Sequence, residues 1–253
     1  MENLNTKFEI SKKLSEKISE SLPFVISSLQ KTKFQYAGKA LVSFISKSGY
    51  LLNSILLSCN NSDIYSSSIL FRSLIEHNFK YLYIFVRTLN ENSDDVGKEY
   101  YCSLKGFEDL KSVQKILNYN KLTFPEKTQW NTKSKNNKNL SEIGKKFDID
   151  KIFQYLINNN NHDNKILEKY KKEYLLERLT EYTNMSSSVH GGPFGEFALL
   201  EIKKDKNKFS KTLNKFIDDS LMLHKSMVET TYLFSSLMDY ETDKFYQEIR
   251  NLK

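Results

Sequence analysis

The sequence predicts an all-α fold, a single-domain helical bundle, from its composition and its apolar periodicity. The 253 residues include only 8 Gly and 3 Pro, against an average usage of about 12 % for these two residues together. Sheet proteins need Gly and Pro at their many turns, so sandwiches, barrels and propellers are excluded. Apolar residues instead recur at helical spacing over long stretches, without an internal repeat or a linker. We therefore expect one all-α domain over residues 1–253.

Three helices are predicted in the first third of the chain. The first covers residues 4–22 and stops near Pro23, and the second runs from about 34 to 59. Asn60 to Asp63 then break the chain and offer N-caps to a third helix over about 64–89. Six of the eight residues on one stripe of this third helix are apolar, which indicates a core helix: Ile64, Ser68, Phe71, Ile75, Asn78, Leu82, Phe85 and Leu89.

The remaining chain is predicted to be helical on both sides of one long loop. A fourth helix follows Ser93 to Asp95 and ends near Leu117, and residues 119–140 form an exposed Asn/Lys-rich loop without periodicity. Short helices are expected over 141–158 and a longer one over about 164–189. The last helix, about 207–239, carries a stripe with seven apolar residues of nine: Phe209, Leu213, Phe216, Ser220, Leu223, Met227, Thr230, Phe234 and Leu237.

Several classes of protein and site are excluded by what the sequence lacks. Cys59 and Cys102 are too few for a disulfide scaffold or a cysteine-based zinc site. The start lacks the pattern of a signal peptide, and the apolar window 69–89 holds charged residues, so we expect a cytoplasmic protein without a membrane span. No phosphate-binding loop, dinucleotide fingerprint or HExxH motif is present. No cofactor and no metal is therefore predicted, and Asp218 and Asp219, near His224, are more simply explained by an exposed helix face.

The net charge of +7 is concentrated in two lysine-rich segments. Residues 111–151 hold ten Lys against four acidic residues, and residues 203–215 hold six Lys against Asp205. Such clusters suit contact with a phosphate backbone, although a solvated surface is the simpler explanation. If these segments contact a nucleic acid, the residues expected at its phosphates are Lys133, Lys135, Lys138, Lys203 and Lys204.

The first chemically unusual segment lies inside the predicted core helix, from Phe71 to His77. Arg72 and Glu76 are four residues apart, so they lie about 40° apart on the helix and can pair. His77 lies about 140° from Arg72 around the helix. The two side chains can therefore meet only near a helix end or between two protomers. A buried Arg72 needs a partner, because unpaired buried charges are costly.

The second unusual segment surrounds His190, where three Gly and one Pro follow a predicted helix within five residues. Gly and Pro end helices, so His190 lies at a helix C-terminus, where the dipole favours its protonated form. A cationic histidine can donate a proton or bind phosphate. The simpler interpretation is a C-capping histidine that follows a last turn rich in hydroxyl groups.

These two segments carry a resemblance to a known superfamily. Arg72-x-x-x-x-His77 resembles the R-x4–6-H motif of the HEPN superfamily of small all-α proteins, and Arg72-x-x-x-Glu76 with the later Ser187-x-x-His190 is similar to a bacterial HEPN-like family of unknown function. The resemblance covers about residues 35–240. It implies a HEPN-like fold and metal-independent RNA cleavage by a homodimer, in toxin or phage-defence systems. Ser73 departs from the usual residue after the Arg, and the motif lies unusually early in the chain.

Two functions follow from the resemblance and stay open at this point. In the first, the protein is an endoribonuclease in which Arg72 holds the scissile phosphate, His190 or His77 is the acid/base, and Glu76 orients Arg72. In the second, the same fold is a non-catalytic module that dimerises or docks a partner protein or antitoxin, with Arg72 and Glu76 as a structural ion pair. An open pocket that contains Arg72 and His190 favours the first, and a sealed pair favours the second.

Overall fold

The structure is a computed structural model that describes residues 2–104, 106–109, 111–112, 115–116, 119, 138–159, 172–189 and 193–252. Of residues 2–4, 138–140, 187–189, 193–196 and 240 only the backbone is described. All regular secondary structure in these ranges is helical, which confirms the predicted all-α fold. His190, Lys133 and Lys135 lie outside the described residues, and the side chain of Lys138 does as well.

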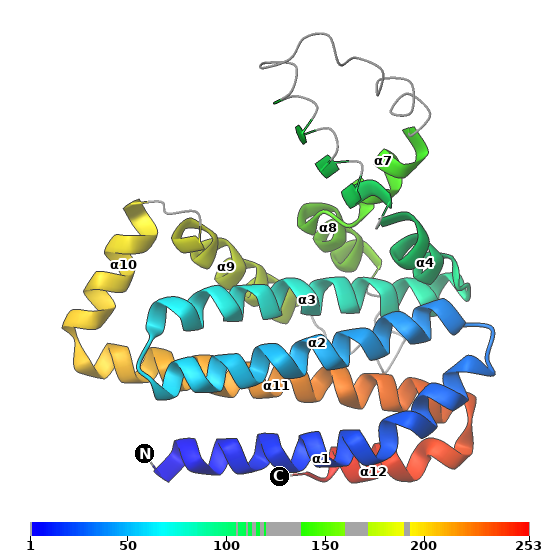
Figure 1. Ribbon diagram of the computed structural model, residues 1–253, viewed down its shortest axis with the longest axis horizontal. Coiled ribbons are helices and arrows are strands. Elements are labelled where there is room, and N and C mark those ends of the chain that lie inside the picture. The colour runs from blue at the N-terminus through cyan, green and yellow to red at the C-terminus, as the bar shows by residue number, and fades with distance from the viewer. Residues whose placement is uncertain are drawn as a thin grey trace.

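Three long helices form the centre of the molecule: α2 (Gln35–Asn60), α3 (Ile64–Glu91) and α11 (Lys206–Met238). Each of the three packs against the other two. In Figure 1 they run side by side across the middle of the view. Their inward faces supply most of the fully buried large side chains, including Phe44, Phe71, Tyr81, Phe85 and Tyr232.

Further helices cover both sides of this centre. On one side α1 (Glu2–Gln30) packs on α2 and α11, and α12 (Asp243–Arg250), after the short η3 (Tyr240–Thr242), packs on α11. On the other side α8 (Ile149–Asn159) and α9 (Lys172–Val189) pack on α3, while α10 (Pro193–Lys204) joins α9 to α11 at one end (Figure 1). The remaining elements are α4 (Asp95–Lys98), the π-helix η1 (Glu99–Leu104) and α7 (Lys138–Lys146).

The predicted core helix is confirmed in both its length and its buried stripe. Asp63 caps its start by accepting a hydrogen bond from the Ser66 backbone N–H, and Asn92 ends it in the left-handed conformation that Asn tolerates. The first seven residues of the predicted stripe are buried, and the eighth, Leu89, is half-buried. The stripe of the last helix is buried from Leu213 to Phe234, whereas Phe209 is half-buried and Leu237, in the final turn of α11, is 57 % exposed.

The start of α2 is held by a carboxylate from another element. Phe34, at the N-cap position, has no side chain that can cap, and the Asp94 carboxylate instead accepts hydrogen bonds from the Tyr36 and Ala37 N–H groups, at 2.9 and 2.7 Å. Gly97 allows this approach, because a Cβ at this position would lie 2.2 Å from the Ala37 nitrogen. The turn from α3 into α4 therefore fixes where α2 begins.

The predicted end of the first helix at Pro23 is wrong, because α1 continues through Pro23 to Gln30. Pro23 lies on the exposed side of α1, where water can bond the carbonyl group that the missing N–H leaves free. Val25 and Leu29 continue the buried stripe beyond it and are almost fully buried. Tertiary packing of the two turns after Pro23 outweighs the local cost of the proline.

The predictions for the second half of the chain are partly wrong at the element boundaries. Lys138 to Leu140, predicted as loop, form the first turn of α7, and the other residues from 120 to 137 lie outside the described residues. The fourth helix is not one regular α-helix, because the π-helix η1 interrupts it directly after α4. Helices α10 and α12 were not predicted, since Gly191 to Pro193 suggested an irregular segment and α12 is short.

Among the described helices, only α2 has the length and apolar composition of a membrane-spanning helix. The apolar segment 69–89 does not meet this criterion. Eleven residues of α2 are buried inside the bundle, and this helix packs on α1, α3, α4 and α11. A core helix of a bundle meets the same criterion.

Candidate functional site

Arg72 joins α3 to α9. Its Nε donates a hydrogen bond to the Ser186 Oγ at 2.9 Å, and its Nη2 donates one to the Tyr182 hydroxyl at 2.8 Å. The guanidinium also lies over the Tyr182 ring, 4.5 Å from its centroid, and 3.7 Å from the Glu76 carboxylate. The side chain is 15 % exposed. The predicted burial and pairing of Arg72 is confirmed, since the guanidinium makes two hydrogen bonds to α9 and an ion pair with Glu76.

Glu76 lies between Arg72 and Lys80 on the same helix. Its carboxylate bonds the Lys80 ammonium at 2.8 Å, which is shorter than its 3.7 Å contact with Arg72. Burial raises the pKa of Glu76, but the hydrogen bond and charge of Lys80 and the charge of Arg72 outweigh burial and leave the pKa below its ordinary value. Glu76 is therefore ionised at neutral pH, and Lys80 is its main partner.

His77 points to the other flank of α3, as its helical position predicts. Its Nδ1 lies 2.7 Å from the Ser73 carbonyl oxygen, which can only accept, so Nδ1 carries the proton. Burial lowers the pKa of His77, and the charges of Lys80 and Lys47 lower it further. At neutral pH the ring is therefore neutral, and Nε2 is an unprotonated base.

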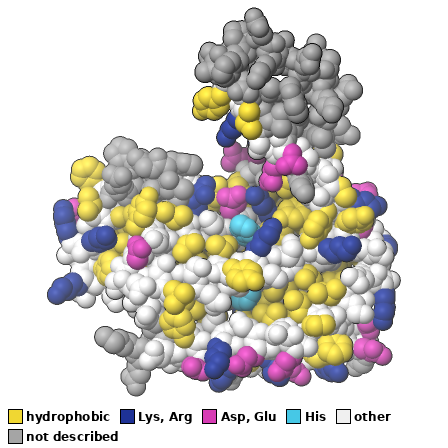
Figure 2. All heavy atoms as spheres, viewed as in Figure 1, with side chains coloured by type: hydrophobic (Ala, Val, Ile, Leu, Met, Phe, Trp, Pro, Cys, Tyr) yellow, Lys and Arg dark blue, Asp and Glu magenta, His cyan; other side chains and the backbone are white. Residues whose placement is uncertain are grey.

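His77 opens into a hollow of about 330 Å³ between α2, α3 and η1, which we call the histidine hollow. The Lys47 ammonium lies near the Tyr100 hydroxyl at 3.3 Å and over the Phe44 and Tyr100 rings. Figure 2 shows histidine, basic and acidic side chains together near the middle of this face of the molecule. The polar groups that line the hollow are those of Lys47, His77, Lys80, Tyr100, Tyr101 and Glu108.

A second hollow of about 380 Å³ adjoins the first, and the two share Lys80, Leu104 and Glu108. We call it the acidic hollow, because four carboxylates line it against two ammonium groups. Its polar lining consists of Glu76, Lys80, Glu108, Lys111, Asp148 and Asp150, together with the Tyr182 hydroxyl. The two hollows lie side by side along α3, which supplies Glu76, His77 and Lys80 to their lining.

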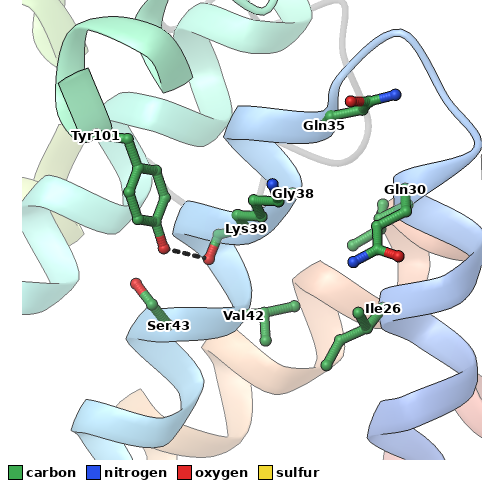
Figure 3. A pocket seen from close by; sticks show the side chains of 9 residues that line it. Ile26, Gln30, Gln35, Gly38, Lys39, Val42, Ser43 and Tyr101 are labelled. Atoms are coloured by element: carbon green, nitrogen blue, oxygen red, sulfur yellow. Dashed lines mark hydrogen bonds between the residues drawn. The ribbon is translucent and has the colours of Figure 1, made fainter.

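A third hollow, of about 240 Å³, lies where α1 ends and α2 begins, and it is mainly apolar. Ile26 and Val42 face each other across it, and the Tyr101 hydroxyl donates to the Lys39 carbonyl oxygen at 3.0 Å (Figure 3). Tyr101 thus separates this hollow from the histidine hollow, which it also lines. The third hollow has no histidine or carboxylate in its lining and offers no acid/base chemistry.

The structure separates the two residues of the R-x4-H motif instead of bringing them together. Arg72 faces α9, whereas His77 faces α2 and η1. Lys203 and Lys204 lie at the end of α10, where Lys203 lines a separate hollow with Ile64 and Tyr65, and Lys204 pairs with Glu201 at 2.6 Å. Sequence reasoning missed Lys47, Tyr100 and Tyr101, which come from other elements. Lys80 had a usable signal, because it follows Glu76 by four residues and His77 by three.

The acidic pair near His224 does not form a metal site. His224 is buried, with its Nδ1 2.7 Å from the Ser48 Oγ, and Asp218 pairs with Lys7 at 2.9 Å. Asp219 was predicted on an exposed face, but it is only 17 % exposed and bonds the buried Arg178 at 3.0 Å. Within the described residues, no group of three His, Cys, Asp or Glu side chains is arranged to hold a metal ion.

Comparison with known proteins gives one match. No curated protein and no solved structure matches the chain. Residues 38–209 match the family of unknown function DUF5677, and this span includes α3, α9, all but the first three residues of α2, and both polar hollows. Because the match covers more than half of the 253 residues, the chain belongs to the DUF5677 family.

Proposed function

We propose that the protein is a HEPN-like, metal-independent endoribonuclease whose reaction takes place in the histidine hollow. The supporting observation is that His77, Lys47 and Lys80 line one open hollow, while the Nδ1 of His77 is held by the Ser73 carbonyl oxygen, which leaves Nε2 as the base. RNA needs no external nucleophile for strand cleavage, because its own 2′-hydroxyl can attack the adjacent phosphorus. A base for that hydroxyl and cations for the phosphate are then sufficient.

The chemistry assigns one role to each group. His77 Nε2 takes the proton from the ribose 2′-hydroxyl, and the 2′-oxygen forms a bond to phosphorus. Lys80 neutralises the phosphate oxygens as their negative charge develops. The bond between phosphorus and the 5′-oxygen breaks, and the leaving oxygen takes a proton from the Lys47 ammonium. The products carry a 2′,3′-cyclic phosphate and a 5′-hydroxyl.

Arg72 has a supporting role in this proposal. Its bonds to Ser186 and Tyr182 hold α9 on α3, and its charge helps to keep Glu76 ionised. Glu76 in turn fixes the Lys80 ammonium at 2.8 Å. Arg72 is thus a positioning residue for Lys80, whereas the sequence alone suggested that it holds the phosphate.

A second function, a non-catalytic binding module, is favoured by the state of Arg72. The guanidinium is largely buried and bonded to two helices, as expected for a structural ion pair. In that case the bundle serves to dimerise or to dock a partner protein, and the histidine hollow has no catalytic role.

A cleavage assay in EDTA distinguishes the two functions. We expect the protein to cut total cellular RNA and leave 2′,3′-cyclic phosphate ends. His77→Asn keeps a donor for the Ser73 carbonyl but removes the base, and it is expected to reduce the rate by about 10²–10⁴-fold. Lys80→Met tests the phosphate contact, and Lys39→Met, a lysine of α2 that lines only the apolar hollow, is the matched control.

Substitution of His190 by Ala is assayed in parallel, because the sequence hypothesis names it as the alternative acid/base. Loss of cleavage in His190→Ala but not in His77→Asn would move the reaction away from the histidine hollow. Cleavage that survives both changes, or no cleavage by the wild-type protein, leaves the binding module as the better account. Circular dichroism first establishes that each variant is folded.

A further inference from the structure

The acidic hollow differs in charge from the histidine hollow that it adjoins. Carboxylates of Glu76, Glu108, Asp148 and Asp150 line it, against the ammonium groups of Lys80 and Lys111. Glu76 is ionised and bonded to Lys80, which leaves three further carboxylates and one further ammonium group. A phosphate group is repelled by this surplus of negative charge, so the second hollow suits another part of a nucleic acid.

The position of the acidic hollow indicates which part that is. The two hollows share Lys80, so a chain whose phosphate lies at Lys80 has its neighbouring base at the acidic hollow. Single-stranded bases are commonly bound by hydrogen bonds to their Watson–Crick edges, and the carboxylates of this hollow can accept such bonds.

Carboxylates only accept hydrogen bonds, so they select a base that presents donors. Guanine presents two adjacent N–H donors on its Watson–Crick edge, N1–H and the 2-amino group, and one carboxylate can accept both. Adenine and cytosine present one amino group beside an acceptor nitrogen, and uracil presents a single N–H between two carbonyl oxygens. The acceptor groups of these three bases face repulsion from the carboxylate.

We propose that the acidic hollow is a base subsite that selects guanine next to the phosphate bound at Lys80, with Asp148 or Asp150 as the bidentate acceptor. Both carboxylates are solvent-exposed at the start of α8, where an incoming base can reach them. The inference rests on the proposed function for the register of the RNA, but guanine selection itself is measurable without cleavage.

The test measures binding of uncleavable RNA. Fluorescence anisotropy gives the affinity for 2′-O-methyl uridine hexamers that contain one G, one A, one C or no other base. A bidentate contact discriminates between bases by roughly 5- to 150-fold, so the hexamer with G is expected to bind tighter than the others by this factor. Equal affinity for all four hexamers would overturn the proposal without any variant.

Two variants and a control locate the effect. Asp148→Asn and Asp150→Asn exchange an acceptor oxygen for a donor, and the double variant is expected to lose the preference for G. Asp148 directly precedes α8, and Asn is as favourable as Asp at the start of a helix, so folding is expected to be preserved. Glu142→Gln, an exposed carboxylate of α7 that does not line the hollow, is expected to keep the preference. A preference for G that the double variant retains would place the subsite elsewhere and refute the assignment.

Two further measurements, binding of 5′-GMP and the base preference of cleavage, distinguish the remaining explanations. If 5′-GMP alone binds as tightly as the hexamer with G, the ligand is a free nucleotide and the RNA subsite is refuted. Cleavage without preference for G refutes this inference and leaves the proposed nuclease in place. A preference for G without cleavage supports the subsite and refutes the catalytic function.

Discussion

Arg72 illustrates how a single side chain stabilises contacts between two helices. Arg72→Ala removes the bonds to Ser186 and Tyr182 together with the contact over the Tyr182 ring. Hydrogen bonds from charged donors contribute about 1.5–3 kcal/mol each, so the loss of both predicts a free energy of unfolding lower by about 3–6 kcal/mol. The cost is not larger, because Glu76 keeps Lys80 as its partner.

Urea denaturation measures this change, with Arg250→Ala on the exposed last turn of α12 as the arginine control. Arg72→Lys is expected to recover only part of the loss, since an ammonium group cannot reproduce the forked contact. An unchanged midpoint for Arg72→Ala would show that α9 is held on α3 by other contacts.

His224 gives the protein a pH-dependent stability. Burial lowers the pKa of His224 from 6.5 to about 4. The unfolded chain therefore binds more protons than the folded chain between pH 6.5 and 4, so stability is complete above pH 6.5 and falls as the pH decreases toward 4. One pKa unit corresponds to about 1.4 kcal/mol, which gives a loss of about 3 kcal/mol at pH 4. Burial also lowers the pKa of His77, so its contribution has the same sign.

The measurement is the free energy of unfolding in urea at intervals between pH 7 and pH 4.5, for the wild type and His224→Gln. The wild type is expected to lose more stability than the variant over this range. An NMR titration of the His224 ring gives the folded pKa directly. A midpoint near 6.5 in that titration would contradict the burial of the ring.

At the scale of the element, the start of α2 depends on a residue that is distant in sequence. Asp94→Ala leaves the Tyr36 and Ala37 N–H groups without their acceptor, and a loss of about 1–2 kcal/mol is expected from the capping effect. Asp95→Ala is the matched control, because the adjacent carboxylate is 69 % exposed and contacts only Lys98, at 3.8 Å. Equal midpoints of thermal unfolding for the two variants would contradict the capping role of Asp94.

The individual helices show what the sequence can and cannot predict. The helices over 64–91 and 206–238 were predicted within two residues at each end, since their caps and apolar stripes are local signals. The continuation of α1 through Pro23 depends on burial of Val25 and Leu29 against other helices, which local rules do not contain. Asp94 was recognised as a residue at a helix start, but the helix that it caps is α2, which precedes it in sequence.

The candidate site was predictable only where one helix supplies it. The helical positions of Arg72, Glu76 and His77 correctly separated Arg72 from His77, because the angle between side chains follows from spacing alone. Lys47 and Tyr100 reach the histidine hollow from α2 and η1, and only the packing of these elements on α3 brings them to His77. The π-helix places Tyr100 and Tyr101 there, and its irregular turn has no signal in the sequence.

For the whole molecule, the net charge of +7 becomes informative once the positions of the lysines are known. Lys47 and Lys80 line the histidine hollow, whereas Lys203 and Lys204 lie on α10, which packs on α9 and α11 at one end of the bundle. If RNA extends from the hollow to α10, both pairs contact phosphates. If the α10 lysines are only a solvated surface, they contribute little to binding.

The salt dependence of RNA binding decides between these two cases. For single strands, the slope of log K against log salt changes by about 0.7 for each phosphate contact, so the loss of two contacts makes the slope shallower by about 1.4. We expect this change for Lys47→Met with Lys80→Met, and again for Lys203→Met with Lys204→Met, measured with an uncleavable uridine 20-mer between 50 and 300 mM salt. Lys12→Met with Lys13→Met, on the exposed side of α1, controls for the loss of net charge. A slope that changes for the first pair but not for the α10 pair would confine the RNA to the hollows and assign Lys203 and Lys204 to the solvated surface.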